Sequence, residues 1–155
     1  MARHIWTVLC KDTIVDSTTG SLTMVEVFEE LTAQILVPHD APLPQQPPIP
    51  LSLKIVSLWE RSALAVPEDK TSFRVRIYDP NGKELSQNEV TYSMLGPHLR
   101  SRNIVSIQNM PAVLAGRYEF RIYGPKGARW MEVAVVPLHL KISVGKADPI
   151  PAKPS

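Results

Sequence analysis

The chain has a single cysteine, Cys10, and a cysteine beside a histidine and a carboxylate is the set of groups that thiol catalysis uses. His4 or His139 is the candidate base, and Asp12 or Asp16 the candidate orienting carboxylate. No local motif places these residues together. Cys10 also lies in an apolar segment typical of a buried strand, whereas a reactive cysteine needs an electropositive, partly open setting. We therefore expect no catalytic residues and a protein that is not an enzyme.

Metal ligands are scattered along the sequence. No histidine has a second ligand at metal-binding spacing; the four are His4, His39, His98 and His139. Asp12 and Asp16, with Asp79 or Asp40, are candidates to gather at one end of a sheet fold and bind calcium, although aspartates in turns usually bond their own backbone. The sequence has no glycine-rich phosphate loop, nucleophile elbow, zinc-binding helix motif or cysteine pair. We expect no metal and no cofactor, with calcium kept as an alternative ligand.

Aromatic residues give a second alternative, a carbohydrate bound at the loops of one end. Two tryptophans exposed on one face could stack on a sugar. Trp6 and Trp59 lie on the same alternating face as the apolar residues of their segments, so we expect both side chains to pack in the core. Trp130, beside Arg129, is the best candidate for an exposed aromatic residue.

Two segments are candidate interaction surfaces. Residues 38–50 contain six of the 15 prolines, a density that favours polyproline II and suits either a rigid connection or docking to an aromatic groove. Residues 98–103 form the most basic short segment, typical of a solvated loop or of an anion contact. Together with Trp130, the candidate surface residues are Pro42, Leu43, Pro44, Pro47, Pro48, His98, Arg100 and Arg102.

Charge and hydropathy indicate the compartment. The 17 Lys and Arg against 15 Asp and Glu give a net charge of +2, too small to predict nucleic acid or an anionic membrane as partner. No apolar window is long enough to span a bilayer, and the apolar stretch at the N-terminus is too short for a secretory signal. One cysteine cannot form an internal disulfide. We expect a soluble, cytoplasmic protein.

Residues 73–92 carry the clearest element. Phe73, Val75 and Ile77 alternate with Arg74 and Arg76, and the Asp-Pro-Asn-Gly sequence at residues 79–82 is typical of a reversal. This predicts a β-hairpin with one buried and one solvated face, so the outward arginines are expected to be solvated.

Other segments repeat that pattern. Residues 5–10 are apolar on both faces, which predicts a strand covered on both sides, and the turn at residues 16–20 leads to a second strand at residues 22–28. Residues 29–37 suit a short helix or a strand, with strand favoured. Further strands are expected at residues 51–61, 104–110, 114–123 and 130–144, the last with a bulge near Val136 and Pro137 that repairs its change of phase.

About eight strands without a long amphipathic helix predict an all-β fold: an antiparallel two-sheet β-sandwich, immunoglobulin-like, with a closed β-barrel as the alternative. Residues 1–145 are expected to form one domain, in which the proline-rich loop at 38–50 crosses between the sheets. Residues 146–155 are expected to be a flexible tail.

Three motifs carry a likeness to a known family. They are Leu9-Cys10-Lys11-Asp12 leading through Asp16 to Gly20-Ser21-Leu22, then Tyr78-Asp79-Pro80-Asn81-Gly82, and Leu114-Ala115-Gly116-Arg117-Tyr118-Glu119-Phe120. Together they resemble a bacterial family of small all-β proteins of unknown function. The resemblance implies an immunoglobulin-like or similar sandwich and no activity. The proline-rich loop and tail depart from the family pattern.

The sequence therefore predicts a non-enzymatic interaction or assembly module. It would self-associate or bind another protein through a sheet edge or through the proline-rich loop. The alternative is a ligand-binding module that uses loops at one end of the sandwich.

Overall fold

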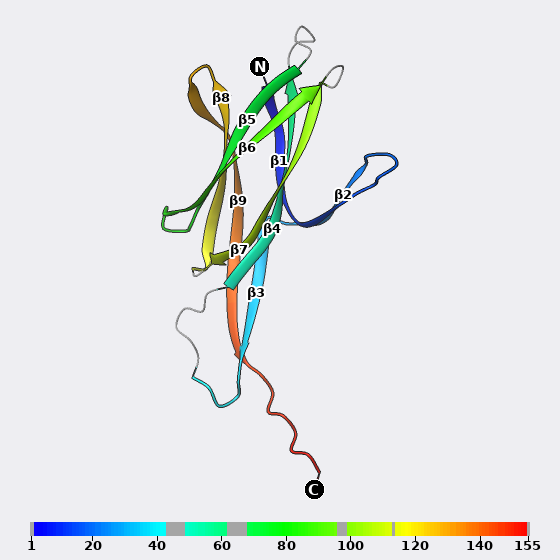
Figure 1. The fold of residues 1–155 in the computed structure, drawn as a ribbon. Coiled ribbons are helices and arrows are strands. Elements are labelled where there is room, and N and C mark those ends of the chain that lie inside the picture. The colour runs from blue at the N-terminus through cyan, green and yellow to red at the C-terminus, as the bar shows by residue number, and fades with distance from the viewer. Residues whose placement is uncertain (1, 43–48, 62–67, 96–98, 113, 155) are drawn as a thin grey trace.

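Alternating apolar and polar residues build two β-sheets that pack face to face in the computed structural model of the chain (Figure 1). The structure describes residues 2–42, 49–61, 68–95, 99–112 and 114–154. Within them the strands are β1 (Ala2–Val15), β2 (Leu22–Val27), β3 (Glu30–Val37), β4 (Ile49–Arg61), β5 (Glu68–Tyr78), β6 (Glu84–Leu95), β7 (Arg100–Ala112), β8 (Gly116–Lys126) and β9 (Arg129–Lys146). The predicted all-β sandwich is confirmed. Residues 30–37 are strand, as favoured over helix.

The strands form a four-stranded sheet A and a five-stranded sheet B. Sheet A has the order β2-β1-β4-β7, and sheet B the order β3-β9-β8-β5-β6. All neighbours among the described strands are antiparallel except β3 and β9, so the predicted antiparallel sandwich contains one parallel pair. Strand β3 lies in sheet B and β4 in sheet A, and residues 43–48 of the predicted proline-rich loop lie outside the described residues. No helix in the described ranges is long and apolar enough to cross a membrane.

The core lies between the sheets and is centred on aromatic rings. Trp59 of β4 stacks on Phe73 of β5, with ring centroids 5.2 Å apart, and both rings contact Tyr92 of β6. The buried indole nitrogen of Trp59 donates to Ser57 Oγ at 3.0 Å. The predicted core position of Trp59 is thus confirmed.

Two local motifs fix the ends of sheet B strands. In the turn between β5 and β6, Asp79 Oδ1 accepts hydrogen bonds from the backbone nitrogens of Asn81 and Lys83, and Gly82 supplies a φ of 81°. This confirms the predicted hairpin. Before β8, Tyr118 Oη donates to the Leu114 carbonyl at 2.7 Å, which is the tyrosine corner found in immunoglobulin-like sandwiches.

The bulge in β9 lies at Val133, not near Pro137 as the sequence predicted. Ile122 pairs with Ala134 and Tyr123 with Glu132, which leaves Val133 as the extra residue. Val135 therefore turns outward and is 38% exposed. Pro137 fits into β9 without a bulge. The amide of His139 points to β3, so the backbone nitrogen of Pro137, two residues earlier, points to the same side. Strand β3 has not begun at that level, so no hydrogen bond is lost when proline has no N–H.

A bulge also changes β1. Its register with β4 shifts between His4 and Trp6, so Ile5 is the extra residue and is 37% exposed, although both faces were expected to be covered. His4 pairs opposite Trp59 and faces the core, whereas Trp6 pairs opposite Leu58 on the outer side of sheet A. Trp6 is only half-buried there, so the core prediction for it was wrong.

Candidate functional site

The free edges of the two sheets are β2 and β7 in sheet A and β3 and β6 in sheet B. Three of them carry features that hinder pairing with another chain. In β2, only six residues long, Glu26 has a φ of 50°. In β7, Asn109 has a φ of 53° within a bulge. In β6, Leu85 is an extra residue near the start of the strand, because Ile77 pairs with Ser86 and Tyr78 with Glu84, and the register from Ser86 to Leu95 is continuous.

Strand β3 has none of these features. Its eight residues contain no proline, glycine or lysine, and its register with β9 is continuous from Glu30 opposite His139 to Val37 opposite Lys146. The one charged side chain in the strand, Glu30, forms an ion pair with Lys141 of β9. That pair lowers the pKa of Glu30. The free side of β3 is thus a regular, nearly neutral backbone edge.

The backbone groups of β3 alternate between β9 and this free edge. The carbonyl of Glu29 accepts from His139, and the carbonyl of Val37 accepts from Ala147, so the odd-numbered residues face β9. In an extended strand the N–H and C=O of one residue point to the same side. The N–H and C=O groups of Thr32 and Gln34 therefore point to the free edge.

The side chains of β3 alternate as well. Leu31 and Ala33 pack against the core, and Ile35 and Val37 continue the same face as half-buried residues, while Leu36 on the other face is 60% exposed. The pairing of β8 with β9 ends at Leu140, so β3 is the only described strand that pairs with the rest of β9. Figure 1 shows the two strands extending together toward the C-terminal end. A two-stranded ribbon is weakly stable alone, so an added strand on β3 would stabilise it.

The outer face of sheet B carries three arginines, each stacked on a ring from another strand. Arg74 lies 4.1 Å from the ring centroid of Trp130, Arg76 lies 5.2 Å from that of Tyr123, and Arg121 lies 4.6 Å from that of Tyr78. Such contacts hold a cation over the negative face of a ring. The arginines are therefore not simply solvated, and Trp130 is covered by Arg74 and not openly exposed.

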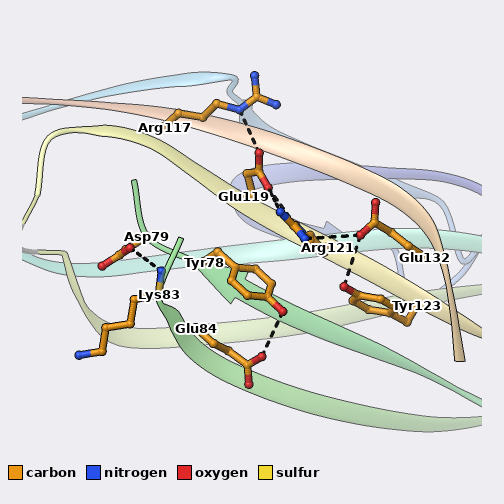
Figure 2. A network of polar contacts seen from close by, with 9 residues as sticks. All are labelled: Tyr78, Asp79, Lys83, Glu84, Arg117, Glu119, Arg121, Tyr123 and Glu132. Carbon is orange, nitrogen blue, oxygen red and sulfur yellow. Dashed lines mark hydrogen bonds and ion pairs between the residues drawn. The ribbon is translucent and has the colours of Figure 1, made fainter. Parts of the chain in front are cut away.

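Carboxylates complete this network, as Figure 2 shows for the part around Arg121. Glu119 accepts from Arg121 at 2.7 Å, and Glu132 lies 3.9 Å from Arg121 and accepts from Tyr123 Oη at 3.3 Å. Burial raises the pKa of Tyr123, so its hydroxyl stays protonated and can donate. Since these groups satisfy one another, the network acts as a stabilising cover of the sheet.

The described interaction candidates lie apart. Pro42 is exposed and follows β3 in the chain. Two candidates lie on sheet A: Arg100 pairs with Glu60 at 3.2 Å, and Arg102 donates to the Gly20 carbonyl at 2.9 Å. Trp130 lies on sheet B. The remaining candidates, Leu43, Pro44, Pro47, Pro48 and His98, lie outside the described residues.

The residues considered for catalysis and metal binding are also separate. Cys10 is buried and pairs opposite Lys54, whereas His4 faces the core and His139 lies on sheet B. Burial and the Asp12 carboxylate raise the pKa of the Cys10 thiol, and Lys54 opposes them. The raised pKa favours the unreactive, protonated thiol. Among the described residues no three His, Cys, Asp or Glu side chains gather as a metal site.

Sequence patterns did not single out β3 among the sheet edges. Its alternation was visible, but its place at an edge depends on pairing with a strand about a hundred residues away in the sequence. The absence of proline, glycine and lysine between residues 30 and 37 does not separate this strand either, because residues 22–27 and 84–95 lack them too.

Comparison with known proteins finds structural matches to this chain but none in sequence. No family model matches the chain, and no curated protein is similar to it in sequence. Among solved structures, the crystal structure of the C-terminal domain of wzt is similar, with 12% sequence identity and a TM-score of 0.48 over 90% of this chain and 73% of that chain.

Proposed function

We propose that the protein is a non-enzymatic assembly module that self-associates through the free edge of β3. The observation that carries the proposal is that β3 joins an uninterrupted register to an apolar face that continues beyond the sandwich body, whereas β2 and β7 have positive φ angles and β6 has a bulge at Leu85. An unblocked edge with an apolar face is a template for strand addition.

A second copy of β3 fits this edge best. In an antiparallel pair the sum of the two residue numbers must be even to keep both apolar faces on one side of the sheet. Placing Gln34 on the twofold axis meets this condition, with Leu31 opposite Val37 and Ala33 opposite Ile35. The two Glu30 carboxylates then lie at opposite ends, so no like charges face each other.

Such a pair forms a closed dimer. A twofold axis uses the same surface on both copies and leaves no edge of β3 free for further growth. It joins the two five-stranded sheets and covers Ile35 and Val37, which continue the core face beyond the sandwich body. The gain is burial of apolar side chains and pairing of exposed backbone groups.

We further propose that the protein is cytoplasmic, because it has a lone cysteine. We also propose that it belongs to a bacterial family of small all-β proteins, because it carries the three sequence motifs. With a net charge of +2 it involves neither nucleic acid nor membrane, and docking of a protein to the proline-rich loop is its second route of interaction.

Sedimentation of the full chain over a concentration series tests the dimer. We expect a mass approaching twice 17.3 kDa. Gln34→Pro removes an N–H that points to the free edge and leaves the β9 ladder intact, so it should give a folded monomer. A native chain that stays monomeric up to about 1 mM contradicts the proposal, as does a Gln34→Pro chain that still dimerises.

A charge swap tests the register. Gln34→Lys alone and Gln34→Glu alone should each be monomeric, because two like charges meet on the axis, whereas a mixture of the two should dimerise. Gln108→Lys on β7 is the matched control, since this side chain is also exposed on an edge strand, and it should dimerise like the native chain. Failure of the mixture to dimerise would exclude Gln34 from the axis.

A further inference from the structure

A cleft of about 620 Å³ opens between the sheets at the end of the sandwich opposite to the β3 ribbon. Residues at the start of β1 form one side, and the β8 and β9 hairpin forms the other. Figure 1 shows these segments near the N-terminus, far from the C-terminal tail. The volume lies in the range of small-molecule sites, about 300 to 1,000 Å³.

The interior of the cleft is apolar. Ala2, Pro125, Met131 and Val133 line it, with the edge of Trp59 at its base. Gly124 lets this wall approach the core closely, because a Cβ there would lie 3.2 Å from the Trp59 ring. Because Trp59 is only 1% exposed, an apolar ligand body would pack mainly against Met131, Val133 and the other aliphatic side chains.

His4 adds an aromatic edge to this wall. Its ring meets Trp59 at 72° with centroids 5.1 Å apart, and its Nε2 is 2.8 Å from Thr7 Oγ1. Burial lowers the pKa of His4, opposed by a hydrogen bond to the Trp6 backbone, so the ring is neutral at neutral pH. His4 contributes surface and no charge.

The charged side chains at the cleft differ in whether they have an ion-pair partner. Arg3 is paired with Glu60 at 2.7 Å, and Glu132 is held by Tyr123 and Arg121 on the outer face. Lys126 is exposed, and no ion pair between described residues involves it. The cleft thus combines an apolar interior with one uncompensated positive charge at its mouth.

We propose that this cleft binds a small organic carboxylate with an apolar body. The body lies against Met131 and Val133, and the carboxylate pairs with the ammonium group of Lys126. An amine of the same size would meet Lys126 as a like charge, and a short carboxylate would leave the apolar wall uncovered.

Titration calorimetry and amide NMR of the full chain test this with octanoate, octylamine and acetate as probes. Octanoate should bind and shift the signals of Gly124 and of the Trp59 indole N–H, and the other two should bind more weakly by about tenfold or more. Equal binding of octanoate and octylamine overturns the proposal. So does the absence of octanoate binding up to about 1 mM.

Two variants locate the site. Lys126→Glu should weaken octanoate binding by about tenfold, whereas Lys83→Glu, an equally exposed lysine near the distant β5 and β6 turn, should not. Met131→Trp should fill the mouth and abolish binding of octanoate. Octanoate binding that survives both Lys126→Glu and Met131→Trp would place it elsewhere and overturn the proposal. The Gln34→Pro chain should bind normally, so this test is independent of the proposed dimer.

Discussion

The indole nitrogen of Trp59 and the hydroxyl of Ser57 form a hydrogen bond of 3.0 Å inside the core, two residues apart on β4. Both side chains are buried. Ser57→Ala leaves the indole N–H unpaired away from water, and we expect a loss of about 1–3 kcal/mol in the free energy of unfolding. Urea denaturation measures it. Ser143→Ala on the exposed side of β9 is the control and should change stability by less than about 0.5 kcal/mol.

His4 should make stability depend on pH just below neutrality. An unfolded histidine binds a proton near a pH of about 6.5, and burial lowers the pKa of His4 in the fold. As the pH falls from about 7 to about 5, the unfolded chain therefore binds more protons than the folded chain does. The free energy of unfolding decreases over that window.

His4→Phe keeps a ring beside Trp59 and should flatten the stability profile in that window, whereas His139→Gln, on an exposed side chain, should not. The comparison uses urea denaturation at each pH. The carboxylates with lowered pKa, Asp16, Glu30 and Glu60, lose their contribution at lower pH, below about 4.5. An unchanged slope in His4→Phe would exclude His4 as the source.

Gly116 should tolerate no side chain. Its φ is 132°, and a Cβ at this position would lie 3.1 Å from the Pro80 ring. Gly116→Ala combines backbone strain with a steric conflict, and we expect a loss of about 1–3 kcal/mol by urea denaturation. Gly127→Ala, where φ is 61° and the space is open, gives the cost of the milder left-handed conformation alone and should cost about 1 kcal/mol. Equal losses would contradict both the added backbone strain at Gly116 and the conflict with Pro80.

The contact between Arg74 and Trp130 should stabilise sheet B. A double-mutant cycle with Arg74→Met and Trp130→Leu should give a coupling energy of about 0.5–1 kcal/mol, because the guanidinium lies 4.1 Å from the ring centroid. Arg117, which pairs with Glu119, gives the matched control cycle with Trp130 and should show no coupling. A coupling as large for Arg117 would mean that the effect is not local.

Sequence patterns predicted the parts of the fold that depend on local chemistry. The turn at Asp79 follows from the residues that form it, and the strand at residues 30–37 from its alternation. The phase change in β9 was also visible. Its position at Val133 was not, because residues 133–136 are all apolar and a bulge at any of them repairs the pattern.

The rest depends on contacts between distant segments. The outward direction of Arg74 could be predicted, but Trp130, which lies beneath it, comes from a strand more than fifty residues later. The same holds for the cleft, where Ala2 and Lys126 meet, and for the edge position of β3. Periodicity gives the side of a strand on which a residue lies and not its neighbour on the next strand.

The parallel pairing of β3 with β9 determines how the protein resists mechanical force. A pull on the tail after Lys146 acts along β9, which is hydrogen-bonded to β3 on one side and to β8 on the other. Such a force shears the bonds of two ladders together, whereas a pull across the β1 and β2 hairpin breaks its bonds one after another. The C-terminal end of the sandwich is therefore its mechanically strong attachment point.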